Sequence, residues 1–120
     1  MATLTAKLTL SSTTATSDSL NLSVSDVLTF SNDVIQKRIA TSTTAAVFLA
    51  ASDYGKSYVY LKNLSGTAAE RIDIRATTTG TDIMQIAAGE WTFFPWAGGH
   101  DLAYDAASGT PVLEIMLWEV

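Results

Sequence analysis

The residue types that perform acid–base or nucleophilic chemistry are few in this chain. His100 is the single histidine, and it follows Gly98-Gly99 in a stretch of turn-forming composition. A Ser-His-Asp set is formally possible with Asp101 or Asp105, but no serine lies in the strained strand-to-helix turn that exposes such a nucleophile. We therefore expect His100 in a solvated loop, and we predict no catalytic residues and no enzymatic activity.

Metal and cofactor chemistry has equally little support in the sequence. The chain has no cysteine and one histidine, which excludes Cys/His catalysis and any histidine-rich metal site. The carboxylates come singly, without the D-x-D-x-D-G run of a calcium loop, and Gly98-Gly99 lacks the strand and helix that flank a phosphate-binding loop. A glycosidase carboxylate pair would have to be assembled by the fold. We predict no metal site and no cofactor.

Composition narrows the class of partner. The net charge of -5 disfavours nucleic acid, which is bound by basic surfaces, and no apolar run approaches the ~20 residues of a membrane-spanning helix. Only 16% of the residues are charged, whereas Ser and Thr make up about a quarter of the chain. Surfaces poor in charge can be buried against another subunit at a small desolvation cost. The composition therefore indicates a protein that assembles.

The elements that position these residues are all expected to be strands, because apolar residues recur with period two. No stretch keeps the i, i+3, i+4 spacing of a helix, although residues 43–51 are apolar enough to fit either a short helix or a central strand. We predict an all-β fold, a two-sheet antiparallel sandwich of jelly-roll type with eight to ten short strands. The expected strands are 3–10, 19–30, 34–41, 43–51, 57–63, 70–77, 83–87, 91–95, 102–105 and 110–120.

The domain organisation follows from a polar stretch near the N-terminus. Residues 11–18 are almost entirely Ser, Thr and Asp, so residues 1–17 are expected to form a strand on a tether, and residues 18–120 the sandwich. The N-terminal strand can pair within its own domain or reach the sheet edge of a neighbour. Its apolar side, formed by Leu4, Leu8 and Leu10, would then be buried in the complex.

Aromatic residues are the remaining candidates for a binding surface. Tyr54, Tyr58 and Tyr60 can form a stripe on an outward face, while Trp91, Phe93, Phe94 and Trp96 crowd one segment. Three roles are open for them: core or rim packing, a subunit interface, or a platform on which sugars stack. In the core interpretation Trp91 and Phe93 point inward. The expected core is Val59, Leu61, Ile72, Ile74, Ile86, Phe93, Leu113, Ile115 and Leu117.

Three segments of the second half share a pattern with a known class of protein. They are Y-V-Y-L-K-N-L at 58–64, I-A-A-G-E-W-T-F-F-P at 86–95, and V-L-E-I-M-L-W-E at 112–119. Together with the opening M-A-T-L-T-A, they resemble small virion structural proteins of tailed bacteriophages, particularly those of marine cyanobacterial phages. The chain departs from that pattern at Ala88, where such hairpins often carry proline. The shared motifs mark a fold rather than a reaction.

The resemblance implies a capsid decoration or cement protein, which would bind the major capsid protein or another virion protein as a homotrimer. It further implies a location in the virion, assembled in the host cytoplasm. A tail, baseplate or head-fibre component is the alternative within this class, and a carbohydrate-binding module using Tyr54, Tyr58, Tyr60 or Trp96 is the alternative of another class. The candidate interface residues are Leu4, Leu8, Leu10, Tyr54, Tyr58, Tyr60 and Trp96.

Overall fold

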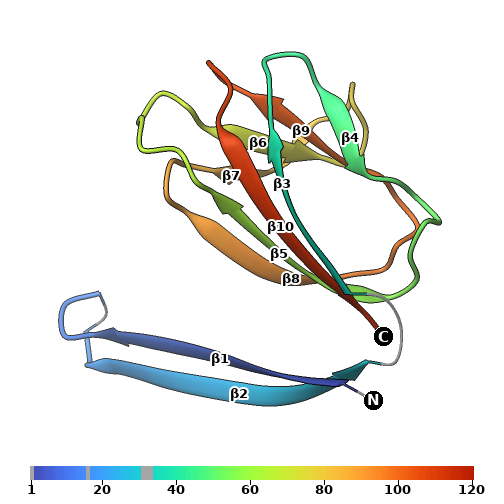
Figure 1. Ribbon diagram of the computed structural model, residues 1–120. Coiled ribbons are helices and arrows are strands. Elements are labelled where there is room, and N and C mark those ends of the chain that lie inside the picture. The colour runs from blue at the N-terminus through green and yellow to red at the C-terminus, as the bar shows by residue number, and fades with distance from the viewer. Residues whose placement is uncertain (1, 16, 31–33) are drawn as a thin grey trace. The chain divides into compact units, whose positions relative to one another are not determined.

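The computed structural model describes residues 2–15, 17–30 and 34–120, and these residues form strands and no helix (Figure 1). No helix of membrane-spanning length and hydrophobicity therefore occurs in this part of the chain. The strands are β1 (Ala2–Ser12), β2 (Leu20–Phe30), β3 (Val34–Ala40), β4 (Ala46–Leu49), β5 (Ser57–Asn63), β6 (Ile72–Arg75), β7 (Asp82–Ile86), β8 (Trp91–Trp96), β9 (Leu102–Ala106) and β10 (Val112–Glu119).

Strands β3 to β10 form a two-sheet sandwich, which confirms the predicted fold class. Sheet 1 has the order β3-β10-β5-β8 and sheet 2 the order β4-β9-β6-β7, with all pairs antiparallel (Figure 1). The pairs nest, because β3 pairs with β10, β4 with β9, β5 with β8, and β6 with β7. Such nesting across two sheets is the jelly-roll topology.

The core lies between the two sheets and is built by strict alternation. In β5 the burial alternates residue by residue, with Val59 and Leu61 fully buried, and β10 repeats this with Leu113, Ile115 and Leu117. Each inward side chain therefore stands beside inward side chains of the neighbouring strands. The buried cluster is Phe48, Leu49, Val59, Leu61, Ile72, Ile74, Ile86, Trp96, Leu102, Leu113, Ile115 and Leu117.

One predicted core residue was wrong. Phe93 lies opposite Tyr60, an outward residue, whereas Phe94 lies opposite the buried Val59. Directly opposed side chains share one face of a sheet, so Phe94 packs against the core and Phe93 points away from it. Trp91, on the same parity as Phe93, is 58% exposed.

The edge strands also correct one expectation. Residues 43–51 were expected to contain a central strand, but β4 covers only Ala46–Leu49, lies at an edge of sheet 2, and shifts register between Val47 and Leu49. That shift lets both Phe48 and Leu49 enter the core, which accounts for the unbroken apolar run. Strand β8 is an edge strand of sheet 1, where the missing N–H of Pro95 is tolerated.

The first two strands form a unit of their own. Contacts divide the chain into Met1–Ser31 and Asn32–Val120. In the first unit β1 pairs with β2 without a register shift, from Ala2 opposite Phe30 to Ser12 opposite Leu20. The sequence-based boundary after residue 17 therefore does not coincide with the division of contacts, because β2 pairs with β1 and not with a sandwich strand. The polar stretch 11–18 overlaps the connection between the end of β1 at Ser12 and the start of β2 at Leu20.

Candidate interaction surface

The outer face of sheet 1, which points away from the core, carries an unusual set of side chains. Register places them in three rows across the strands β3, β10, β5 and β8. The first two rows contain four aromatic rings and one methionine, and the third is charged apart from the ring of Trp91. Row one is Val34, Trp118, Tyr58 and Pro95; row two is Gln36, Met116, Tyr60 and Phe93; row three is Arg38, Glu114, Lys62 and Trp91.

The rings of the first two rows pack on one another. Tyr58 and Phe93 are stacked, with centroids 6.0 Å apart and planes 5° from parallel. Trp118 meets Phe93 at 6.2 Å with the planes at 56°. The ammonium of Lys56 lies 5.3 Å from the centre of the Tyr58 ring. These contacts join β5, β8 and β10 into one apolar patch, which we call the aromatic face, on a surface that is not the core.

The charged residues of the third row border the aromatic face on one side. Arg38 donates through Nε and Nη2 to Glu114 Oε2, at 3.1 and 2.9 Å. Tyr60 Oη lies 3.4 Å from Glu114 Oε1, and burial, followed by the nearby Glu114 carboxylate, raises the pKa of Tyr60. The phenol therefore stays protonated and can donate to the carboxylate. Lys62 stands between Glu114 and Trp91 in register, with no ion pair within the described residues.

The β1–β2 hairpin has one apolar and one polar face. Side chains that oppose each other across the hairpin share a face, so the even-numbered residues of both strands lie together. Toward the turn this face holds Leu8 opposite Val24 and Leu10 opposite Leu22, which are 41%, 51%, 44% and 40% exposed. Asp26, opposite Ala6, is the one charged residue on this face among the described residues.

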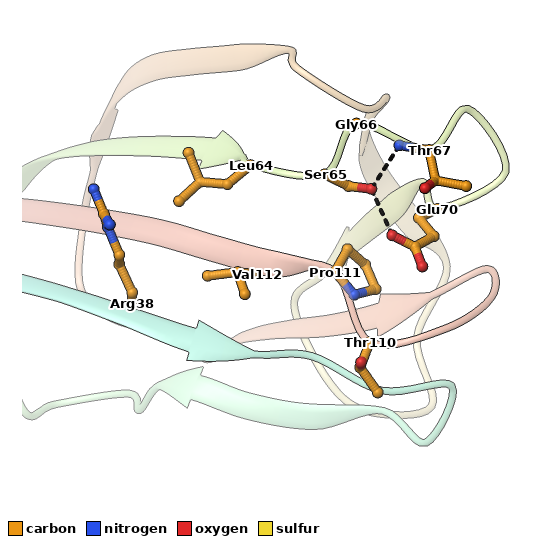
Figure 2. Close-up of a pocket in the computed structure, with 9 residues that line it drawn as sticks. All are labelled: Arg38, Leu64, Ser65, Gly66, Thr67, Glu70, Thr110, Pro111 and Val112. Carbon is orange, nitrogen blue, oxygen red and sulfur yellow. Dashed lines mark hydrogen bonds between the residues drawn. The ribbon is translucent and has the colours of Figure 1, made fainter.

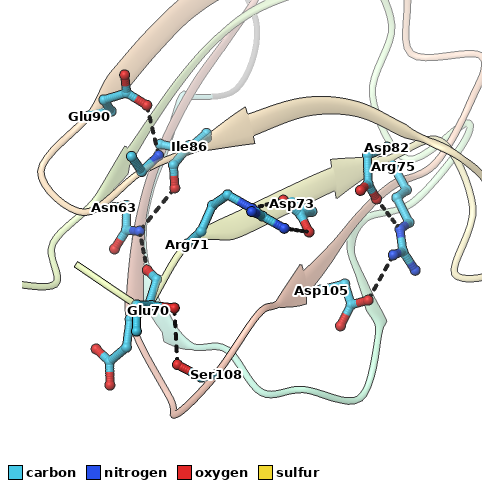
Figure 3. A network of polar contacts seen from close by, with 12 residues as sticks. Asn63, Glu70, Arg71, Asp73, Arg75, Asp82, Ile86, Glu90, Asp105 and Ser108 are labelled. Atoms are coloured by element: carbon cyan, nitrogen blue, oxygen red, sulfur yellow. Dashed lines mark hydrogen bonds and ion pairs between the residues drawn. The ribbon is translucent and has the colours of Figure 1, made fainter. Parts of the chain in front are cut away.

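The outer face of sheet 2 carries charged side chains, in contrast to the aromatic face of sheet 1. Asp73 and Asp105 oppose each other on β6 and β9, and two arginines compensate this like-charge pair (Figure 3). Arg71 Nε donates to Asp73 Oδ1 at 2.7 Å, and Arg75 Nη2 lies 2.8 Å from Asp105 Oδ2. Arg75 also binds Asp82. The charges on this face are thus paired among themselves.

A shallow pocket lies at the end of the sandwich near residues 64–70 and 110–112 (Figure 2). Its polar groups already bind one another: Ser65 Oγ donates to Glu70 Oε2, and the backbone N–H of Thr67 donates to Ser65 Oγ at 3.0 Å. Arg38, also in the lining, pairs with Glu114. We assign no ligand to this pocket. No group of three or more metal-ligating side chains occurs in the described parts of the chain.

The structure places the predicted interface residues in three different environments. Leu4, Leu8 and Leu10 share the apolar face of the hairpin, and Tyr58 and Tyr60 share the aromatic face. Tyr54 is half-buried and packs against the core, and Trp96 is 7% exposed and belongs to the core. Sequence reasoning missed Trp118, Met116 and Phe93 on the aromatic face, and Leu22 and Val24 on the hairpin. His100 is exposed in a loop.

Comparisons with known proteins give a likeness of fold. No family model matches the chain, and no curated protein matches it. A solved structure of Bacillus endospore appendages, described as a novel family of disulfide-linked pili, is similar to it, with a TM-score of 0.51 and 19% sequence identity. The match covers 73% of this chain and 86% of that one. At this identity the two share a fold, and nothing about function follows from the match.

Proposed function

We propose that this chain is a non-enzymatic structural subunit of a larger particle, most specifically a decoration or cement protein on the outer capsid surface of a tailed phage. One observation carries the proposal: the hairpin unit has an apolar face and no second layer among its own described residues. A two-stranded sheet is marginally stable in water without a layer to cover its apolar side. Exposed Leu8, Leu10, Leu22 and Val24 are what a subunit requires for binding a neighbouring protein within such a particle.

The contrast between the two outer faces of the sandwich supports the same proposal. The aromatic face of sheet 1 is poor in charge, and aromatic residues and methionine are enriched at protein interfaces. The outer face of sheet 2 carries the paired charges of Arg71, Asp73, Arg75 and Asp105. A subunit attached to a particle would turn the first face toward protein and the second toward water.

Fold and resemblance agree with this class of protein. Jelly rolls are frequent in viral capsid and lectin domains, although a fold alone does not determine function. The resemblance at residues 58–64, 86–95 and 112–119 favours a virion protein and a homotrimer. Many identical contacts on one particle would turn a modest affinity per subunit into durable attachment.

A subunit of an extracellular filament is the second candidate, and the likeness to the endospore appendage structure favours it. Those appendages are described as disulfide-linked. This chain has no cysteine, so a filament made from these 120 residues would be held without disulfides.

Electron microscopy with an antibody against the chain distinguishes these candidates. Virions and extracellular filaments from the producing culture are labelled, and quantitative mass spectrometry of each purified fraction gives the copy number. We expect labelled capsids with hundreds of copies per particle. A handful of copies at the tail would favour the tail component, labelled filaments the second candidate, and a chain found in neither fraction would contradict both.

A glycan array tests the carbohydrate-binding alternative in parallel. Trp96 is buried and Tyr58 is stacked on Phe93, so the exposed ring of Trp91 is the one best placed to meet a sugar. Binding that Trp91→Ala abolishes would favour a lectin over a structural subunit.

A further inference from the structure

The apolar face of the hairpin and the outer face of sheet 1 carry a similar sequence of side-chain rows along their strands. On the hairpin two apolar pairs, Leu10 with Leu22 and Leu8 with Val24, precede a row that contains Asp26. On sheet 1 two apolar rows precede the row that contains Lys62. Successive rows on one face of any strand are about 7 Å apart, so the two patterns have the same spacing. Each face therefore offers two largely apolar rows followed by a charged row. The charge on the hairpin is Asp26, and on the sheet Arg38 pairs with Glu114, which leaves the positive charge of Lys62.

The edges of sheet 1 are poorly suited to strand addition. On β8 Pro95 lacks the N–H that a ladder needs, and on β3 Lys37 points inward, donating from Nζ to the carbonyl of Phe48 at 3.1 Å. Proline and inward-pointing lysine are devices that protect edge strands from pairing with another chain. A partner of sheet 1 is therefore expected to bind its outer face and not its edge.

The side chains toward the hairpin turn are the ones that need a partner. Leu8, Leu10, Leu22 and Val24 are all at least 40% exposed. Asp26, in the adjacent row, would be buried together with them, and a carboxylate that loses water needs a cation nearby. Lys62 would supply that cation, since it lies in the third row of the outer face of sheet 1, next to the aromatic face.

We propose that the hairpin of one copy packs its apolar face onto the aromatic face of a second copy, with Asp26 beside Lys62. This inference rests on the proposed function and names the partner of the hairpin as another molecule of the same chain. The two surfaces differ, so the contact is heterologous: it closes into a ring if the rotation between copies allows, and otherwise continues as a filament. Repeated contacts of this kind would connect neighbouring subunits on the surface of the particle.

Cysteine cross-linking of the full chain tests the contact, since the natural sequence has no cysteine to interfere. One preparation carries Leu8→Cys and a second, labelled with heavy nitrogen, carries Met116→Cys in the second row of the aromatic face. A short bismaleimide is added to the mixture. We expect a cross-linked dimer of one light and one heavy copy, with a yield on the order of tenfold above random collision because docking raises the effective concentration of the two thiols.

Two matched variants serve as controls. Thr9→Cys places the thiol next to Leu8 on the polar face of the hairpin, and Gln85→Cys places it on the outer face of sheet 2. Neither should cross-link above the collision level. If Leu8→Cys or Met116→Cys does not fold by circular dichroism, Val24→Cys and Tyr60→Cys replace them in the same rows.

Two outcomes would overturn the inference. A cross-link that forms only within single molecules of the double variant L8C/M116C would mean that the hairpin covers its own sheet. No cross-link between any of these positions would mean that another molecule covers the hairpin. Neither outcome changes whether the chain is found in particles, so failure of the contact and failure of the proposed function are distinguished.

Discussion

The ring of Tyr58 on β5 stacks on the ring of Phe93 on β8, with centroids 6.0 Å apart and planes 5° from parallel, on the outer face of sheet 1. Trp118 on β10 completes the cluster from the neighbouring strand. Aromatic pairs contribute about 0.5–1.5 kcal/mol beyond their buried area. A cluster of three rings outside the core is therefore partly ordered before any partner binds. This reduces the side-chain conformational entropy that is lost when a partner binds.

Phe93→Ala and Phe94→Ala separate assembly from folding, because the two phenylalanines are neighbours that point to opposite faces. Phe94 packs against the core, so Phe94→Ala should lower the free energy of unfolding by about 2–4 kcal/mol. Phe93→Ala removes one ring from the aromatic face and should cost about 1 kcal/mol or less in the monomer. Urea unfolding at low protein concentration measures both.

The same two variants should differ in the opposite direction when self-association is measured, with Phe93→Ala having the larger effect. Sedimentation velocity at increasing concentration should show Phe93→Ala associating more weakly than the natural chain, and any folded fraction of Phe94→Ala associating normally. Equal association of Phe93→Ala and the natural chain would remove the aromatic face from the interface.

Strand positions were largely predictable from the sequence, because period two sets both a strand and its buried side. Residues 57–63 match β5, and alternation there gave the correct inward residues. In β8 the order Trp-Thr-Phe-Phe-Pro-Trp places aromatic residues on both parities, so alternation cannot identify the inner face. The register with β5 decides it, and register is a tertiary property that the segment alone does not contain.

The separate hairpin was not predicted, for a similar reason. The stretch 11–18 looks like a tether, and apolar alternation in residues 20–30 fits a sandwich strand as well as a hairpin arm. What distinguishes them is the partner, and β1 and β2 match in length and apolar parity from Ala2 to Phe30. A comparison of the two segments for equal length would have been the available signal.

Asn63→Asp should destabilise the sandwich strongly. The buried amide nitrogen of Asn63 donates to the carbonyls of Glu70 at 2.8 Å and Ile86 at 3.1 Å (Figure 3). The amide oxygen of Asn63 accepts from the N–H of Ser65 at 3.0 Å. Aspartate cannot donate, so two buried carbonyls lose their partner and face a carboxylate. We expect a loss of about 2–4 kcal/mol in urea unfolding.

Asn21→Asp makes the same chemical change at an exposed position of β2 and serves as the control. Surface changes of this kind usually alter stability by about 0.5 kcal/mol or less. If Asn63→Asp and Asn21→Asp had equal effects, Asn63 would not connect sheet 1 to β7.

Asp82→Asn should make stability less dependent on pH in acid. The hydrogen bond from Arg75 lowers the pKa of Asp82 below its ordinary value. A carboxylate whose pKa is lower in the folded state stabilises that state above the pKa of the unfolded chain, about 3.9, and the contribution disappears as the pH falls through the folded pKa. The stability difference between the natural chain and Asp82→Asn should therefore be constant from neutral pH to about pH 5 and shrink below about pH 4.

Thermal unfolding between neutral and acid pH measures this difference. Asp53→Asn, in the exposed turn after β4, controls for the removal of one negative charge. A gap between the natural chain and Asp82→Asn that widens on acidification would contradict the assignment, since the sign would be opposite.

Gly98→Ala and Gly89→Ala separate a steric clash from backbone strain, because both glycines have φ of +81°. A Cβ at Gly89 would meet nothing within 4 Å, so alanine there should cost about 1 kcal/mol for the left-handed conformation alone. A Cβ at Gly98 would lie 2.2 Å from the carbonyl oxygen of Tyr54, and the carbonyl of Gly98 accepts from the N–H of Ser52 at 2.9 Å. The loop would have to separate from residues 52–55, and we expect a loss of at least about 2 kcal/mol in urea unfolding. Equal losses at the two glycines would mean that the loop after β8 moves freely enough to accept the methyl group.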